Sequence, residues 1–170
     1  RPGLSDDNRE MRLSSELNLV LESRRLDRNR RRRIPRCLNF KVRSGRKIAV
    51  DAAGVPVEFD NRTYRGTIEV FGNSRNTFTV VNELPIEEYL LGVVPNELSP
   101  VAFSQIEALK AQAVAARTYI ARNLGQYKNE GYDICATDSC QVYMGQATEH
   151  PLSTQAVQET SGLIATFGDQ

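Results

Sequence analysis

The sequence predicts an α+β fold, in which an antiparallel β-sheet packs with an alanine-rich central helix and a long loop. Short runs of β-branched and aromatic residues fill residues 38–81, an apolar stripe at helical spacing follows over 104–125, and a polar, aromatic stretch occupies 125–145. The chain has 170 residues, of which 40% are hydrophobic and 25% charged. That balance is typical of one globular domain with a real core.

The N-terminal segment, residues 1–36, differs from the rest in polarity and arginine content. Arg24 to Arg36 holds eight arginines and one aspartate. We expect residues 1–36 to be a basic arm or linker and residues 37–170 to be the folded domain. The arginine run fits a solvated, self-repelling tether or a specific binding patch. Leu13, Leu17, Val20 and Leu21 recur at helical spacing, so a short amphipathic helix is possible.

Charge is distributed unevenly along the chain. Residues 1–80 contain 18 Lys/Arg and 10 Asp/Glu, a net charge of +8, whereas residues 81–170 contain 4 and 11, a net charge of −7. A basic half suits nucleic acid, an anionic membrane or an anionic polymer, and the acidic half argues against a nucleic-acid enzyme. No apolar run approaches the roughly 18 residues of a membrane span. The sequence begins at Arg1, so any export signal would lie upstream.

Four or five antiparallel strands are expected between residues 38 and 81. Gly, Asn and Asp separate the apolar runs there, as they do at turns. Alternation over residues 67–72 predicts a sheet with one face toward water. The runs are LNFKVRSG, RKIAVDAAG, VPVEFDN, YRGTIEVFGNSRN and TFTVV.

Two helices should follow the strands. Pro85 opens the first, with acids in its first turn to complement the helix dipole, and Pro95 should end it. Ser104 and Glu107 form the S-x-x-E pattern of a capping box for the second helix, and Gly125 stands where a left-handed cap belongs. Its expected inner stripe comprises Ile106, Leu109, Ala113, Ala116, Ile120 and Leu124.

A third, shorter helix is expected near the end of the chain. Pro151 and Ser153 introduce it, and Gly162 closes it. Residues Leu163 to Phe167 then read as a strand, followed by a turn whose second strand is absent. The sequence therefore reads as a domain truncated at its C-terminal end.

The stretch from Val80 to Asn123, followed by residues 131–145, resembles the SpoIID family, the sporulation stage II protein D and amidase-enhancer family. The resemblance covers roughly residues 40–168, outside the arginine-rich arm. The matching residues are Asn82, Leu84, Pro85, Glu88, Tyr89, Gly92, Val93, Val94, Glu97, Ala108, Leu109, Lys110, Ala111, Gln112, Ala113, Ala115, Ala116, Arg117, Thr118, Tyr119, Gly131, Tyr132, Asp133, Cys135, Thr137, Cys140, Gln141, Val142 and Tyr143.

The resemblance implies a peptidoglycan lytic transglycosylase that cleaves glycan strands and leaves a 1,6-anhydro end. Its catalytic acid is the glutamate of a G-V-V-x-x-E motif, which on this chain is Glu97. The family also includes non-catalytic enhancers of cell-wall amidases, and a purely structural envelope module would share the fold. The resemblance implies peptidoglycan glycan strands as the partner, and a cell-wall amidase as a further partner. It implies no cofactor. It also implies a location outside the cytoplasm, in the cell envelope.

Local sequence also supports Glu97. Prolines bracket it on a short segment between two helices, and Val93, Val94 and Leu98 flank it, so partial burial would favour its protonated form. A transglycosylase needs only one carboxyl group, because the sugar's own 6-hydroxyl closes the ring. No second acid has an equal claim, since the acids at residues 83, 87 and 88 fit a helix start. The alternative role for Glu97 is a solvated loop acid or a cap.

Three more residues are candidates for binding the substrate. Arg117 lies on or beside the buried stripe, where it needs a carboxylate or carbonyl partner, so it either holds Glu97 or a loop or forms a structural ion pair. Gln141 and Tyr143 offer an amide and an aromatic face to a sugar. Their alternative role is to pin the predicted active-site loop, Gly125 to Gly145, to the core.

The three cysteines leave two questions open. Cys135 and Cys140 are close enough to bridge across a turn or to remain free thiols, whereas Cys37 has no obvious mate. Some members of the resembled family bind zinc near this loop. Here Ser139 stands where those members carry a histidine, and His150 is the single histidine of the chain. Two thiolates and one distant imidazole make a poor tetrahedral site, so no metal is predicted.

Overall fold

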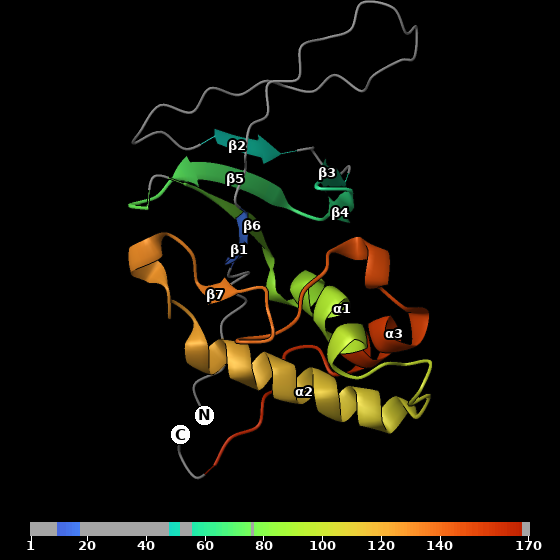
Figure 1. The fold of residues 1–170 in the computed structure, drawn as a ribbon. Coiled ribbons are helices and arrows are strands. Elements are labelled where there is room, and N and C mark those ends of the chain that lie inside the picture. The colour runs from blue at the N-terminus through green and yellow to red at the C-terminus, as the bar shows by residue number, and fades with distance from the viewer. Residues whose placement is uncertain (1–9, 18–47, 52–55, 76, 168–170) are drawn as a thin grey trace, which may run out of the picture.

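The computed structural model describes residues 10–17, 48–51, 56–75 and 77–167. The arginine run, Cys37 and the strand expected near residue 40 lie outside these residues. The fold is α+β, as the sequence predicts, with a sheet on one side of a helical layer (Figure 1). The elements are β1 (Glu10–Leu17), β2 (Ile48–Asp51), β3 (Val57–Phe59), β4 (Arg62–Tyr64), β5 (Thr67–Gly72), β6 (Phe78–Pro85), α1 (Ile86–Glu97), α2 (Ile106–Asn123), β7 (Ile134–Cys135) and α3 (Pro151–Glu159).

Five strands form the main sheet in the order β2-β5-β6-β1-β7. Neighbouring strands are antiparallel except that β7 runs parallel to β1. The separate β3–β4 hairpin turns through Asp60 and Asn61, whose φ angles of 51° and 58° are those of a tight I′-type connection. Five of the eight residues of β6 are buried, and both of its edges are paired, with β5 on one side and β1 on the other.

The helix considered for the segment around Leu13 and Leu17 is wrong. Residues 10–17 form β1, which pairs with β6 over its whole length, from Glu10 opposite Pro85 to Leu17 opposite Phe78. The assignment of residues 18–36 to an arm stays a prediction, because these residues are not described.

Helix α1 runs through Pro95 and ends at Glu97, so the predicted stop at Pro95 is wrong. A proline lacks one donor, and in the last turn of a helix only one internal hydrogen bond is lost. Pro85 stands immediately before α1, as predicted, and Tyr89, Leu90, Val93 and Val94 become fully buried. Glu97 therefore belongs to the end of a helix and not to a connecting segment.

Helix α2 buries the predicted stripe, with Leu109, Ala113, Ala116 and Ile120 at its centre. Its small alanine side chains allow close contact with α1 and α3, the two helices that it crosses in Figure 1. The capping box does not form: Gln105 precedes the helix, without a side-chain cap. Gly125 follows it with a φ of 77°, the left-handed conformation expected there.

Helix α3 begins after His150, whose ring nitrogen accepts a hydrogen bond from the backbone N–H of Leu152. Residues 163–167, all of which are described, form no strand, and that expectation is wrong. They have no regular secondary structure. Among the described residues, no helix has both the length and the apolar character to cross a bilayer.

Candidate functional site around Glu97

Glu97 lies at the C-terminal end of α1 and faces solvent. Its carboxylate oxygen Oε1 accepts a 2.8 Å hydrogen bond from the backbone N–H of Val142, 45 residues farther along the chain. The partial burial expected for Glu97 is therefore wrong. The side chain is instead held by a backbone donor from the loop between α2 and α3.

The loop reaches Glu97 because α1 has no side chain at Gly92. A Cβ there would lie 2.7 Å from Cε2 of Tyr143 and 3.0 Å from the carbonyl oxygen of Gly145. One turn later, the amide of Asn96 donates to the Gly92 carbonyl at 2.6 Å and to the Thr148 hydroxyl at 2.8 Å. The contacts of Gly92 and Asn96 lie on the same face of α1. They hold the loop against the helix in the turn that precedes Glu97.

Below the loop, a buried set of polar side chains connects it to the sheet and the helices. The Tyr89 hydroxyl donates to the Gln141 side chain at 3.2 Å, and the Gln141 amide donates to the Ala116 carbonyl at 3.4 Å. The Tyr143 hydroxyl donates to Asn82 of β6 at 3.1 Å. The rings of Tyr89 and Tyr143 are also in contact, with their centroids 5.1 Å apart.

These buried phenols are held in their neutral form. Burial raises the pKa of Tyr89 above its ordinary value, and the neighbouring Tyr143 raises it further. Burial likewise raises the pKa of Tyr143, with a further contribution from Tyr64. Both hydroxyls therefore act as hydrogen-bond donors over the physiological pH range.

Gln141 and Tyr143 are each only 6% exposed. Of the two roles considered for them, pinning the loop to the core is the one that these contacts favour. Direct contact of either side chain with a sugar stays a prediction.

A disulfide joins Cys135 to Cys140 and answers the question that their spacing left open. The Cys140 sulfur also accepts a hydrogen bond from the Cys135 backbone N–H at 3.3 Å. The bridge closes the turn directly before Gln141, and the Tyr143 backbone N–H returns to the Ala136 carbonyl at 3.3 Å. Val142, which binds Glu97, therefore stands between Gln141 and Tyr143, and hydrogen bonds hold both of these neighbours in place.

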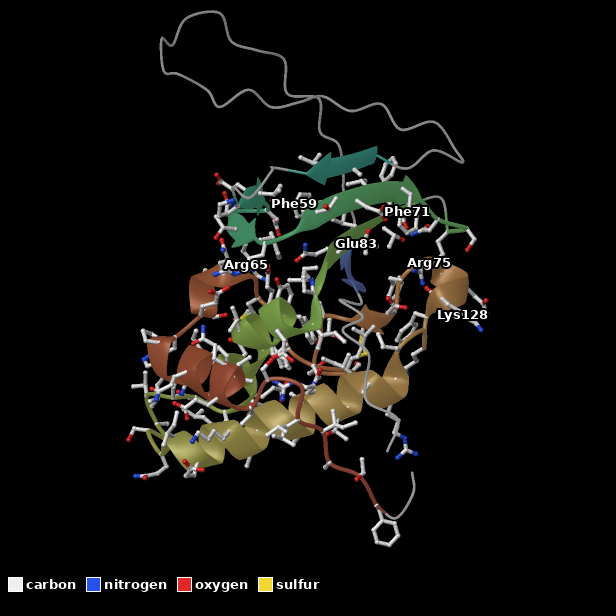
Figure 2. The ribbon with its side chains drawn as sticks, turned by 180° about the vertical axis from the view of Figure 1, so that it is seen from behind. Phe59, Arg65, Phe71, Arg75, Glu83 and Lys128 are labelled. Atoms are coloured by element: carbon white, nitrogen blue, oxygen red, sulfur yellow. A yellow bond between two sulfur atoms is a disulfide. The ribbon has the colours of Figure 1, made fainter. Side chains whose placement is uncertain are left out.

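The far end of the loop is tied to the small hairpin. The guanidinium of Arg65 binds the Glu149 carboxylate through two hydrogen bonds of 2.9 and 2.8 Å. Gly145, with a φ of 74°, lies so close that a Cβ would be 2.4 Å from the carbonyl oxygen of Thr63. In Figure 2, Arg65 lies beside the segment that precedes α3.

Arg117 has the carboxylate partner that the sequence requires, but the partner is Glu87. Nε and Nη2 of Arg117 each lie 2.8 Å from a Glu87 oxygen, and Nη1 donates to the Leu163 carbonyl at 3.0 Å. Arg117 is 4% exposed. Glu87 is at the start of α1 and Glu97 at its end, about 15 Å apart along the axis. The contacts favour a structural ion pair, and a substrate role for Arg117 stays a prediction.

Sequence reasoning missed several residues that build this site. Glu87 was explained by the helix dipole alone, and neither Asn96 nor the Arg65–Glu149 pair was identified. The alternating pattern of Met11, Leu13 and Leu17 is a period-two signal that would have indicated β1. The tertiary partners left no local signal.

No group of three or more His, Cys, Asp or Glu that could hold a metal ion occurs within the described residues. The two cysteines of the loop are joined in their disulfide, and His150 caps α3.

Beyond Glu97, the connection to α2 exposes two apolar side chains, Val101 at 82% and Phe103 at 56%.

The chain is similar to proteins of bacterial sporulation. The model of the SpoIID family, described as stage II sporulation protein, matches residues 74–167. An uncharacterized protein of Brachyspira hyodysenteriae is 37% identical over 161 residues, covering 91% of this chain and 39% of that protein. Stage II sporulation protein D of Bacillus subtilis is 38% identical over 105 residues, covering 53% of this chain and 30% of that protein.

The chain thus spans less than two fifths of the length of these relatives. No solved structure matches it. The family match includes Glu97, the loop that binds it, and helices α1, α2 and α3. From these residues we conclude that the chain belongs to the SpoIID family.

Proposed function

We propose that this chain cleaves the glycan strands of peptidoglycan as a lytic transglycosylase, with Glu97 as its single acid and base. Membership of the SpoIID family supports a role connected with sporulation and the cell wall. The observation that carries the proposal is the solvent-facing carboxylate of Glu97, held at 2.8 Å by the Val142 N–H at the end of a rigid helix.

The chemistry needs one carboxyl group at a fixed position. Glu97 first donates its proton to the leaving glycosidic oxygen as the bond from that oxygen to the anomeric carbon breaks. The carboxylate then removes the proton of the sugar's 6-hydroxyl, whose oxygen bonds to the anomeric carbon. The 1,6-anhydro ring closes, Glu97 regains its proton, and no water is consumed.

The contact around Glu97 fixes the orientation of its carboxylate. The Val142 N–H donates to Oε1, and no donor from the described residues bonds to Oε2. A backbone donor can fix the orientation of the carboxylate without adding a mobile side chain to the site. Positioning of this kind is a large part of what an enzyme contributes to a proton transfer.

The test is digestion of amidase-treated glycan strands, followed by mass spectrometry for 1,6-anhydro ends. We expect anhydro product from the chain and none above background from Glu97→Gln. Glu58→Gln, an exposed acid of β3, is the matched control and should be fully active. Anhydro product from Glu97→Gln at the parental rate would refute the mechanism.

A second candidate is a non-catalytic, peptidoglycan-binding enhancer of a cell-wall amidase. The exposed Val101 and Phe103, four and six residues after Glu97, favour it, because apolar side chains in the open suit a protein partner. Co-sedimentation with cell walls and amidase assays separate the two. Wall binding and amidase stimulation without anhydro product would establish the enhancer, and loss of that stimulation in Val101→Ser/Phe103→Ser would locate its surface.

A further inference from the structure

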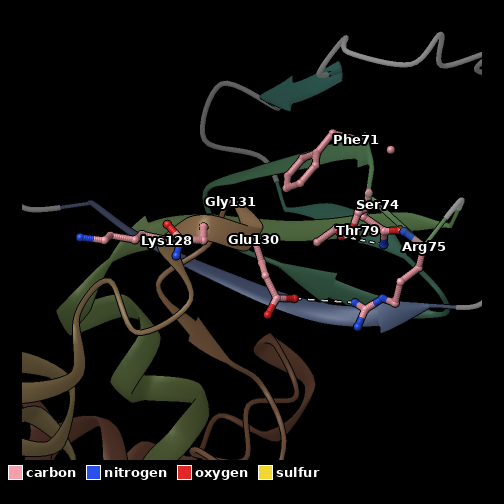
Figure 3. Close-up of a pocket in the computed structure, with 10 residues that line it drawn as sticks. Phe71, Ser74, Arg75, Thr79, Lys128, Glu130 and Gly131 are labelled. Carbon is pink, nitrogen blue, oxygen red and sulfur yellow. Dashed lines mark hydrogen bonds and ion pairs between the residues drawn. The ribbon is translucent and has the colours of Figure 1, made fainter.

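A pocket lies away from Glu97, between the β5–β6 hairpin and the turn that follows α2. Its cavity of about 620 Å³ is bounded by residues 71–75 and Thr79 on one side and residues 128–131 on the other. We call it the hairpin pocket (Figure 3). A volume of this size is typical of small-molecule sites.

The hairpin pocket is separate from the candidate site. In Figure 2, Phe71, Arg75 and Lys128 lie on the opposite side of the molecule from Arg65. Arg65 binds Glu149, which directly follows the Thr148 that contacts Asn96. The two sites therefore occupy different ends of the fold and share no residue.

One wall of the pocket is fixed by Asn73. Its side-chain oxygen accepts hydrogen bonds from the backbone N–H groups of Arg75 and Thr77 at 3.0 and 3.1 Å, and from the Thr77 hydroxyl at 2.9 Å. Its amide donates to the buried Thr79 hydroxyl at 3.1 Å. The hairpin is thus organised before any ligand binds, which reduces the entropy lost on binding.

The opposite wall is fixed by Gly131. Its φ is 93°, and a Cβ there would lie 2.8 Å from Cζ of Phe71. The turn therefore packs directly against the Phe71 ring, which is itself half-buried. Close contact between a glycine and an aromatic ring sets the width of the pocket.

The lining combines one aromatic ring with many neutral polar groups and a balanced ion pair. Arg75 and Glu130 approach to 3.7 Å across the pocket, with side chains 54% and 48% exposed (Figure 3). Ser74 and Asn129 add a hydroxyl and an amide. The side chain of Lys128 extends away from the Arg75–Glu130 pair in Figure 3.

This combination distinguishes between classes of ligand. An anion would face the Glu130 carboxylate, a cation would face Arg75, and a purely apolar ligand would leave the amide and hydroxyl groups without partners. A neutral sugar ring avoids all three conflicts. Its hydroxyls both donate and accept, so they can bond to Glu130 and Arg75 together, and its C–H face can lie on an aromatic ring.

We propose that the hairpin pocket binds neutral pyranose units of a saccharide. This goes beyond the proposed function, because it assigns a second site that holds sugar and does no chemistry. If Glu97 acts on a glycan, the hairpin pocket gives the same polymer a second point of attachment.

The test is titration of the isotope-labelled chain with chitobiose in its N,N′-diacetylated form, a neutral disaccharide, monitored by amide NMR. We expect chemical-shift changes at residues 71–75 and 128–131. Asn129→Ala and Glu130→Gln should each weaken this binding about threefold to tenfold, the effect of one exposed polar or ionic contact. Gln126→Ala and Glu107→Gln change exposed side chains outside the pocket and should bind as the parent does.

The outcomes separate this inference from the proposed function. Chitobiose binding at the hairpin pocket that persists in Glu97→Gln supports the second site, whether or not glycan is cleaved. Shifts confined to Glu97 and Val142 would overturn the second site and leave the proposed function standing. The second site is also refuted if no shift occurs, or if inorganic phosphate or the dipeptide D-alanyl-D-alanine perturbs the pocket more strongly than chitobiose.

Discussion

The backbone N–H of Val142 and the carboxylate of Glu97 are 2.8 Å apart, although α2 and the disulfide loop separate them in the chain. The contact depends on backbone and not on the identity of the valine side chain. Glu97 is therefore positioned by the shape of a loop, and that shape depends on Tyr89, Gln141 and the Cys135–Cys140 bridge.

Removal of the Val142 donor is the first prediction. Val142→Pro deletes the N–H, whereas Val142→Ala retains it. A hydrogen bond to a charged group contributes about 1.5–3 kcal/mol, so we expect Val142→Pro to form anhydro product about tenfold to a hundredfold more slowly. Val142→Ala should stay within about threefold of the parent. Equal rates for both variants, with unchanged melting temperatures, would show that this contact does not position Glu97.

The Glu87–Arg117 pair should matter for stability and not for chemistry. Glu87→Ala leaves the buried guanidinium without its carboxylate, and we expect a loss of about 2–3 kcal/mol in the free energy of unfolding. This loss is smaller than that for a fully buried ion pair, because the Glu87 side chain is 39% exposed. Glu88→Ala, in the same helical turn, should cost about 1 kcal/mol or less. Urea unfolding measures both. A Glu87 variant with normal stability and no activity would reverse this assignment.

The disulfide should stabilise the folded protein and slow the opening of the loop that follows it. The bridge closes a ring over a separation of only five residues, for which chain-entropy arguments give about 2 kcal/mol. We expect Cys135→Ser/Cys140→Ser to lose about this much stability in urea, and to show faster amide exchange at Gln141 and Val142. Peptide mapping without reductant checks the linkage itself. Slow exchange retained at Val142 would mean that Tyr143 and Gln141 hold the loop unaided.

The buried tyrosines predict a loss of stability at high pH. In the folded protein the pKa of Tyr143 and that of Tyr89 lie above the ordinary value of 10.0, because burial disfavours the phenolate. Unfolding therefore releases protons above pH 10. The stabilisation is fully present below that pH and decreases as the pH rises toward the folded pKa, by up to about 1.4 kcal/mol per pH unit for each tyrosine.

Urea unfolding between pH 9 and pH 11.5 measures this slope. Tyr143→Phe removes one of these groups and should give a shallower pH dependence, at a cost of about 1 kcal/mol at neutral pH for the lost hydrogen bond to Asn82. An identical slope in Tyr143→Phe would exclude Tyr143 as a source of the effect.

The sequence could predict the features that local patterns determine. The stripe of α2, the left-handed Gly125 and the strands between residues 48 and 81 follow from periodicity and turn residues. The helix end at Pro95 was wrong because a proline in the last turn costs one hydrogen bond, which packing of Val93 and Val94 offsets.

The parts that failed depend on partners distant in the chain. The exposure of Glu97 is set by a loop 45 residues away, and the partner of Arg117 comes from α1. Leu13 and Leu17 fit helical spacing, but β6 offered an edge, and a strand formed. Local sequence carries no record of such neighbours.

The pairing of β1 with both β6 and β7 decides which segment of the chain could be moved into another protein and still fold. The family match begins at residue 74, whereas β1, β2 and β5 all precede it. A cassette cut at that position would carry Glu97 but leave β6 with two open edges and β7 with no neighbour, a condition that favours aggregation. The segment that matches the family model is therefore shorter than the folding unit, which includes β1 from Glu10 onward.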